Sequence, residues 1–204
     1  MEVVEVYKPG HHFSAVFEAQ GSAPESYYTL AEALAVVSRY IEEKRLEKAG
    51  DRAWVVLDAQ LCDALYKGAV KKGSLFPTEV HKKELGPMVQ KRMQAHHQVT
   101  RGGEVVVRKG QLHPVQIMTE RRQGNKRVTR VSGVESFLVD PVAMASELQR
   151  KFAASTAVSE VAGKKGQMEV LVQGGVLEDL GWHLTDHYNI PKKYILVCDK
   201  TKKS

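Results

Sequence analysis

Cysteine is scarce in this chain of 204 residues, and the usual marks of secreted or membrane-embedded proteins are missing. Its two cysteines, Cys62 and Cys198, stand far apart and offer no spaced pair of metal ligands. No apolar run approaches the ~20 residues of a membrane-spanning helix. The first residues, Met-Glu-Val-Val-Glu-Val, lack the basic start and apolar core of a signal peptide. We therefore expect a cytoplasmic protein with free thiols and no membrane partner.

The signatures of the common enzyme classes are also missing. The run Gly163-Lys-Lys-Gly166 does not have the spacing of a phosphate-cradling Walker loop, and no G-x-S-x-G is present. Neither cysteine lies in a catalytic signature. We therefore expect a protein that is not an enzyme, with no cofactor and no small-molecule substrate.

Two histidine pairs are candidate metal ligands. The run His183-Leu-Thr-Asp-His187 is close to the H-x-x-E-H zinc motif, because it puts two imidazoles on one helical face. Its acid is the shorter Asp, and no clear third ligand follows, so histidines at the edge of the core are the better interpretation. The doublet His11-His12 likewise has no further ligand at a recognised spacing. No metal site is expected.

The net charge of +6 is unevenly distributed. Residues 1–100 carry 13 basic and 13 acidic side chains, whereas residues 101–204 carry 17 and 11. The whole excess therefore lies in the second half. This asymmetry argues for two domains, with an anionic partner for the second.

A dense cluster of cations lies between two predicted strands in the second half. Residues 114–119 and 128–131 are rich in β-branched side chains, and Gln-Gly-Asn at 123–125 favours a tight turn, so a β-hairpin is predicted. Cations this close repel one another, and a polyanion would relieve them. A solvated basic turn without a partner remains the alternative. The hairpin tip carries one acid, Glu120, and five cations: Arg121, Arg122, Lys126, Arg127 and Arg130.

Helical signals dominate the first half. Thr29 and Glu32 form a T-x-x-E capping box at the start of one amphipathic helix. Asp58 can cap a second helix. Residues 77–93 give further helical signals, which are interrupted at Gly86-Pro87.

A small hairpin with its turn at Gly102-Gly103 follows these helices, as in a winged-helix domain. Residues 1–26, in contrast, show little periodicity and are expected to be extended or loop. The boundary between the domains is expected at 109–113, where Gly110 and Pro114 favour an interruption of regular structure.

Strand and helix signals in the second half follow the order β-β-α-β-β-α-β. Asp140-Pro141 opens the first of its helices, because Asp is a good N-cap and Pro suits the first helical position. The order favours a mixed or antiparallel sheet with both helices on one face, an α+β arrangement. The residues expected in its core are Phe152, Leu148, Val170, Val172, Leu180 and Leu184.

On these residues, the second half resembles the family of translation initiation factor one, which has this element order. The family's basic first loop is matched by Arg-Gln-Gly-Asn-Lys-Arg at 122–127, with Thr129 and Gly133 after it. Its Lys-Lys-Phe helix end and the following Thr-x-Val strand are matched at 150–152 and 156–158, and its Gln-Gly at 173–174. The family usually carries Asp next, where this chain has Gly175.

The first half resembles a SWIB-type, winged-helix-like domain, with Tyr27-Tyr28-Thr29 opening its helix. The two modules in this order resemble the C-terminal part of a ribosome-binding translation factor. The expected domains are an extended N-terminal segment at 1–26, the SWIB-type domain at 27–108, a linker at 109–113, the initiation-factor-one-like domain at 114–198 and a basic tail at 199–204.

The resemblance implies a non-catalytic, monomeric factor that binds the small ribosomal subunit, through ribosomal RNA, near the tRNA and mRNA of the P site. It also implies GTP-independent delivery of tRNA, and release of deacylated tRNA and mRNA, in initiation, reinitiation and recycling. The alternative is a SWIB-type protein-binding or DNA-binding chromatin module. The residues expected to contact RNA are Arg121, Arg122, Gln123, Gly124, Asn125, Lys126, Arg127, Arg130, Arg150, Lys151, Lys164 and Lys165.

Overall fold

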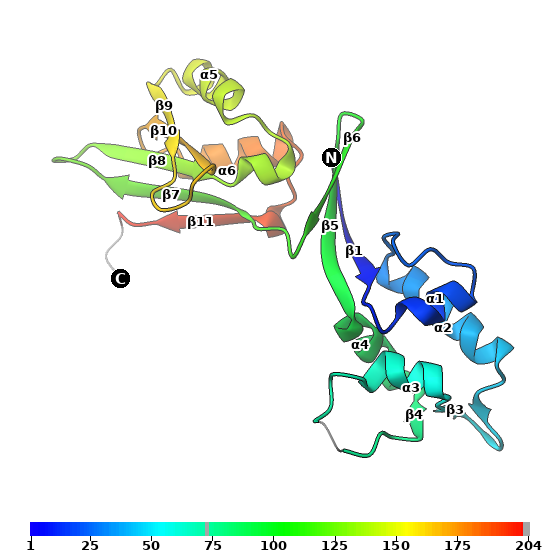
Figure 1. Ribbon diagram of the computed structural model, residues 1–204. Helices are drawn as coiled ribbons and strands as arrows, with labels where there is room; N and C mark the ends of the chain where they lie inside the picture. The colour runs from blue at the N-terminus through cyan, green and yellow to red at the C-terminus, as the bar shows by residue number, and fades with distance from the viewer. Residues whose placement is uncertain (72–73, 202–204) are drawn as a thin grey trace. The chain divides into compact units, whose positions relative to one another are not determined.

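The computed structural model describes residues 1–71 and 74–201 (Figure 1). Residues 202–204 of the expected basic tail lie outside the described residues. No helix in the described part of the chain is long and apolar enough to cross a membrane. The chain divides into two compact units, an N-terminal unit of Val3–Gln98 with Val106–Gln111, and a C-terminal unit of Met1–Glu2, Val99–Val105 and Leu112–Ser204.

In the part of the N-terminal unit that the structure describes, four helices combine with two small sheets, and this mixed composition agrees with the predicted α+β class. One sheet has the order β1-β5-β6 and the other the order β2-β3-β4. The elements are β1 (Glu2–Pro9), α1 (Ser14–Ala19), α2 (Leu30–Glu43), β2 (Glu47–Lys48), β3 (Asp51–Val56), α3 (Ala59–Tyr66), β4 (Glu79–His81), α4 (Lys82–Arg92), β5 (Met93–Arg101) and β6 (Glu104–Lys109).

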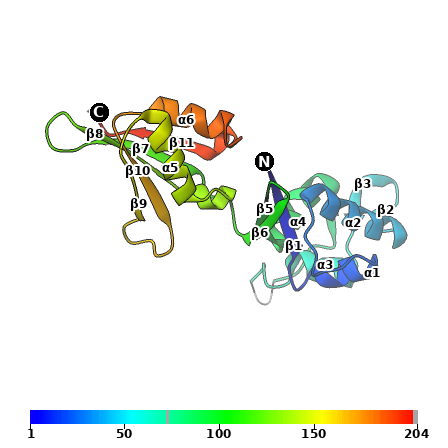
Figure 2. The same ribbon diagram turned by 90° about the horizontal axis from the view of Figure 1, so that it is seen from above.

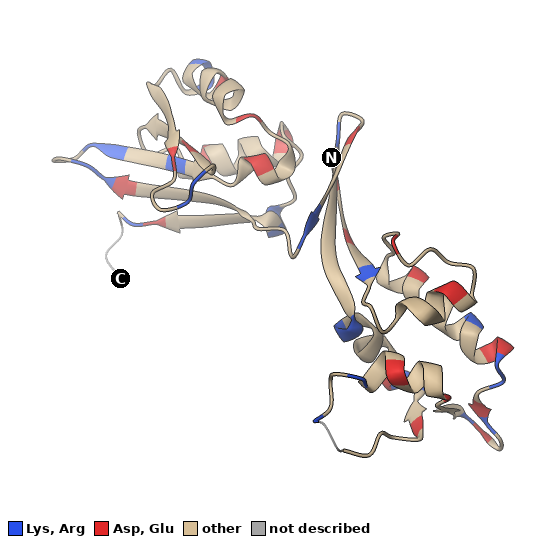
Figure 3. Cartoon of the chain, viewed as in Figure 1, with Lys and Arg blue, Asp and Glu red and all other residues tan. Residues whose placement is uncertain are grey.

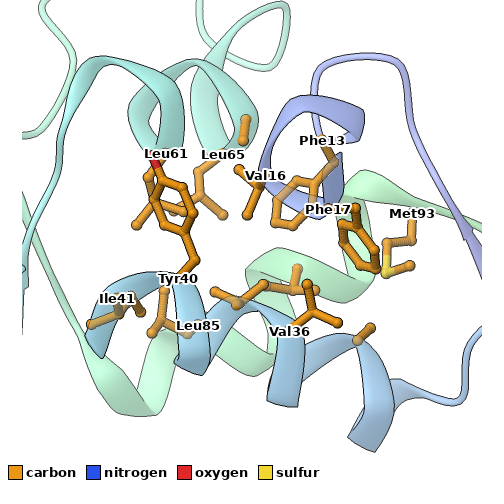
Figure 4. Packing of buried hydrophobic residues seen from close by; sticks show 14 of the residues in the cluster. Phe13, Val16, Phe17, Val36, Tyr40, Ile41, Leu61, Leu65, Leu85 and Met93 are labelled. Carbon is orange, nitrogen blue, oxygen red and sulfur yellow. The ribbon is translucent and has the colours of Figure 1, made fainter. Parts of the chain in front are cut away.

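Residues 3–26 contribute to this unit, and the expectation that 1–26 is an extended or loop segment is wrong for α1. Phe13, Val16 and Phe17 are fully buried and pack against α2 and α3 in the core (Figure 4). Their spacing of three and four is helical, but the helix is so short that its periodicity does not stand out between Gly10 and Gly21.

The predicted caps of α2 and α3 are confirmed. Thr29 and Glu32 form the reciprocal capping box at the start of α2. The Asp58 side chain accepts a 2.8 Å hydrogen bond from the Leu61 amide at the start of α3. The buried Tyr40 of α2 donates its hydroxyl to the same carboxylate at 2.7 Å, so Asp58 also joins the two helices.

The prediction for residues 77–93 needs correction. Glu79–His81 is a strand, in which Val80 pairs with Val55 of β3, and α4 then runs through Pro87 without a break. His81 caps the helix by accepting from the Lys83 amide at 3.1 Å. Pro87 is exposed, and its missing N–H removes one helical hydrogen bond without breaking α4.

A five-stranded sheet of order β11-β7-β8-β10-β9 forms the C-terminal unit. β11 pairs in parallel with β7, whereas the other pairs are antiparallel, so the sheet is mixed. The elements are β7 (Val115–Arg121), β8 (Arg127–Ser132), the 3-10 turn η1 (Val134–Phe137), α5 (Pro141–Phe152), β9 (Thr156–Glu160), β10 (Met168–Gln173), α6 (Leu177–Asp186), the 3-10 turn η2 (Lys192–Tyr194) and β11 (Ile195–Asp199).

Both helices of this unit cover one face of the sheet (Figures 1 and 2). α5 packs on β9 and β10, α6 packs on β7 and β11, and a hydrogen bond from His183 to Glu147 joins the two helices. Alternate residues of the strands, such as Ile117 and Val170, point toward the helices and are fully buried. Asp140 caps α5 as predicted, accepting from the Val142 amide at 2.9 Å.

Five of the six residues predicted for this core are fully buried, and Phe152 is the exception. α5 ends at Phe152, because Ala153 adopts a left-handed conformation with φ of 45°. The phenyl ring therefore lies at the rim of the core and lines a surface cavity beside Trp182.

Truncation of Leu148 should cost more stability than truncation of Phe152. Leu148→Ala removes a fully buried side chain and should cost about 2–5 kcal/mol. Phe152→Ala should cost less, because part of its ring is already in water. Urea unfolding followed by Trp182 fluorescence, in a Trp54→Phe background, measures both. A larger loss for Phe152→Ala would show that its ring is buried in solution.

Candidate nucleic-acid interface

The β7–β8 hairpin presents the predicted cation cluster at its free end (Figure 3). The strands are paired to their last residues, with Arg121 opposite Arg127, and the Arg122 amide donates to the Lys126 carbonyl oxygen at 2.8 Å. Gly124 takes the positive φ of 67° that the turn requires. Every residue from 121 to 127 is exposed, so the whole turn is open to a partner.

Four cations at this end, Arg121, Arg122, Lys126 and Arg127, form what we call the tip cluster. Within the part of the chain that the structure describes, none of them forms an ion pair. Arg121 and Arg127 are direct cross-strand partners, and like charges in such positions are destabilising. A bound polyanion would remove this repulsion.

Arg130 differs from the tip cluster, although the sequence grouped it there. Its guanidinium group donates to Glu120 at 2.9 Å and to Glu169 at 2.6 Å, so it links β7, β8 and β10. Burial alone would lower the pKa of Arg130, but the hydrogen bonds and charges of the two carboxylates outweigh it and raise the pKa. Its charge is thus offset within the sheet.

A buried hydrogen-bond network fixes the base of the hairpin. The hydroxyl groups of Thr119 on β7 and Thr129 on β8 lie 2.9 Å apart. Thr129 also donates to the Gly174 carbonyl oxygen at 2.8 Å and accepts from the Val176 amide at 3.1 Å. The two hairpin strands are thereby tied to the segment between β10 and α6. Two threonines on the inward face of predicted strands were the sequence signal for this network.

Gly175 lies directly beside Arg127 of the tip cluster. The Arg127 carbonyl oxygen accepts from the Gly174 amide at 2.9 Å. A Cβ atom built on Gly175 would stand 3.0 Å from Cδ of Arg127, so glycine leaves room for the arginine stem. The position at which this chain departs from the family pattern therefore shapes the surroundings of a predicted contact residue.

The remaining predicted cations do not all lie near the tip cluster. Lys164 and Lys165 lie in the β9–β10 turn, just before β10 begins at Met168. β10 ends next to the hairpin, where Gln173 lies opposite Val128. The two basic turns are thus at opposite ends of the sheet, about 20 Å apart at 3.3 Å per strand residue. The predicted contact residues form two separate groups.

Arg150 and Lys151 belong with the tip cluster rather than with the other turn. They are exposed in the last turn of α5, which leads through Ser155 into β9. The Ser155 carbonyl oxygen accepts from the Gln173 amide, at the hairpin end of β10. The end of α5 therefore points toward the same end of the sheet as the tip cluster.

The structure places a third potential metal ligand, the carboxylate of Glu147, beside His183 and His187, which the sequence did not show. Oε1 of Glu147, on α5, lies 2.5 Å from Nε2 of His183 and 3.4 Å from Nε2 of His187. Tyr188 donates its hydroxyl to Oε2 at 2.7 Å. No local pattern marks Glu147, because its partners are on another helix. We call Glu147, His183 and His187 the α5–α6 cluster.

Burial lowers the pKa of His183, although Glu147 acts in the opposite direction. Burial alone would raise the pKa of Glu147, but the hydrogen bonds from Tyr188 and His183 outweigh it and lower the pKa. The carboxylate is thus the charged centre of the cluster.

Comparison with known proteins agrees with the resemblance. Residues 111–191 match the family described as "Translation initiation factor SUI1". The chain is 31% identical to human "Eukaryotic translation initiation factor 2D" over 92% of its own length and 32% of that protein. It is also 31% identical to "Translation machinery-associated protein 64" of Saccharomyces cerevisiae, over 100% of its length and 36% of that protein.

The crystal structure of the C-terminal domain of human eIF2D superposes with a TM-score of 0.80. The two chains are 29% identical, and the match covers 95% of this chain and 96% of the other. The region that carries the hairpin is thus similar to the SUI1 translation initiation factors. The chain as a whole is a homologue of the C-terminal part of eukaryotic translation initiation factor 2D, and it spans about a third of the length of the curated relatives it matches.

Replacement of Thr129 by Val should destabilise the C-terminal unit and loosen the base of the hairpin. The variant keeps the shape but leaves the Val176 amide and the Gly174 carbonyl oxygen without their partner, which should cost about 1–3 kcal/mol. Urea unfolding and hydrogen exchange at the Val176 amide measure the two effects. Thr185→Val, which removes only a bond to the Gly181 carbonyl within α6, is the control. Unchanged exchange at Val176 would contradict this role for Thr129.

Proposed function

We propose that this chain is the ribosome-binding part of a non-catalytic translation factor, which contacts the RNA of the small ribosomal subunit near the P site through the tip cluster. The observation that carries the proposal is four exposed cations on a hairpin whose base is fixed by buried hydrogen bonds. Phosphate contacts by such side chains position a protein on RNA without reading its sequence. The names of the matched proteins support a role in translation initiation.

The finer steps follow from the proposed position at the P site. There the factor would deliver tRNA without GTP hydrolysis, and would help to release deacylated tRNA and mRNA in reinitiation and recycling. Arg122 and Arg127 can form bidentate phosphate contacts or stack on an unpaired base, which Lys cannot reproduce. Arg150 and Lys151 would contact RNA next to the tip cluster. Lys164 and Lys165 would contact either a separate RNA segment or no RNA.

In this proposal, the N-terminal unit provides a second docking surface and reads little RNA by itself. Its charge is balanced over residues 1–100. A surface cavity between α2 and α4 has an apolar part formed by Leu34, Val37, Ile41 and Leu85 and a charged part that includes Glu42, Glu47, Lys82 and Lys83. It can hold an apolar side chain of a protein partner that also carries charged groups. This cavity is also the observation that favours the second candidate function, a SWIB-type chromatin module that binds protein or DNA.

Replacing Arg122, Lys126 and Arg127 together by Ala should weaken binding to purified small ribosomal subunits and flatten its salt dependence. Three phosphate contacts to single-stranded RNA contribute about two units to the slope of log affinity against log salt, and the variant should lose them. Folding should be unaffected, because exposed charges contribute little to stability. Co-sedimentation over a series of salt concentrations gives the slope.

The matched control is a variant in which Lys44, Lys71 and Lys91, which lie outside the α2–α4 cavity, are replaced by Ala. It removes the same net charge from exposed positions of the N-terminal unit. If both triple variants lose affinity equally, the tip cluster has no special role and net charge alone explains binding. If neither loses affinity while the full chain binds duplex DNA tightly, the chromatin function is favoured.

Arg130→Gln should separate stability from binding. The variant breaks the ion pairs with Glu120 and Glu169, so it should lower the urea midpoint of the C-terminal unit. Its salt slope for subunit binding should stay near that of the unchanged chain, because Arg130 is already paired. A slope reduced as much as in the tip-cluster variant would place Arg130 in direct contact with RNA.

A further inference from the structure

We propose that the α5–α6 cluster binds a divalent transition metal ion of the Zn²⁺ type, which joins α5 to α6. Glu147, His183 and His187 offer one carboxylate oxygen and two imidazole nitrogens, all within 4.8 Å of one another. Two imidazoles and a carboxylate are a ligand set that zinc prefers in proteins. The proposal does not rest on the proposed function, although Lys151 borders both sites.

The two histidines are placed for joint coordination by the helix itself. His187 follows His183 by one turn, and its amide donates to the His183 carbonyl oxygen at 2.9 Å, so helical geometry continues through it. The imidazole rings are stacked, with centroids 4.8 Å apart and an angle of 10° between their planes. Both Nε2 atoms approach the same carboxylate oxygen, and three ligand atoms therefore converge on one point.

The distances fit a bound ion after a small adjustment. Zinc bonds to nitrogen and oxygen of about 2.0–2.2 Å place ligand atoms about 3.4 Å apart in a tetrahedron. The separation of Glu147 Oε1 from His187 Nε2 is already 3.4 Å. The 2.5 Å hydrogen bond between Glu147 and His183 must lengthen by about 1 Å, as the ion takes the place of the shared proton, which leaves to solvent.

The surroundings of the cluster have the features of a metal site. Tyr188 holds Oε2 of Glu147, which leaves Oε1 for the ion, and such hydrogen bonds orient metal-bound carboxylates. His183 is 8% exposed, so one ligand is held firmly within the core. The adjoining surface cavity is lined by Asp179, Asp186 and Lys151, and it gives an ion a path from solvent to the fourth coordination position.

Isothermal titration of the full chain with Zn²⁺ alone, in protein prepared without a histidine tag or chelator, tests the proposal. The expected result is saturable binding of about one ion per chain. His187→Ala and Glu147→Gln should each weaken binding by more than about 100-fold, since even the loss of a supporting hydrogen bond costs 10–100-fold. Tyr188→Phe should fall within that 10–100-fold range.

Two controls make the result decisive. His113→Ala removes an exposed histidine elsewhere in the C-terminal unit and should bind Zn²⁺ like the unchanged chain. His187 is itself exposed, so its variant should keep a native circular dichroism spectrum. No saturable binding, or binding that persists in folded His187→Ala and Glu147→Gln but disappears when His11 and His12 are replaced, would overturn the proposal.

Discussion

The buried hydroxyl group of Thr129 is the contact on which the hairpin end of the C-terminal unit depends. It meets the Thr119 hydroxyl, the Gly174 carbonyl oxygen and the Val176 amide, and so brings together β7, β8 and the entry to α6. Polar groups that are buried away from water lower the stability of the fold unless they form hydrogen bonds with one another. The direction of the hairpin and the start of α6 are therefore set by the same few hydrogen bonds.

Much of the fold could be predicted because its signals are local. The capping box at Thr29, the cap at Asp58 and the Asp140-Pro141 start of α5 each depend on residues within one helical turn. α1 was missed because one and a half turns of helix leave too short a pattern. Pro87 was misjudged because its position in α4 is decided by packing of Leu85 and Val89, which outweighs one lost hydrogen bond.

The candidate interface was predictable only where its residues are neighbours in sequence. The tip cluster is one short turn, and its exposure follows from its composition. The pairing of Arg130 with Glu169 and the position of Lys164 at the other end of the sheet depend on strand register, which connects residues far apart in the chain. The contact of Glu147 with the two histidines was likewise not predictable, because it depends on the packing of α5 against α6, which are far apart in the chain.

The facing pair of Arg121 and Arg127 makes strand pairing weaker at the turn of the hairpin than further along its strands. Toward the sheet, alternate pairs of the ladder, such as Ile117 with Val131 and Thr119 with Thr129, are buried, whereas the last pair carries two like charges. The two like charges weaken the pairing closest to the turn, while the buried threonine pair holds the strands further in. The pair nearest the turn is therefore the one whose pairing an anion between the two guanidinium groups would strengthen most.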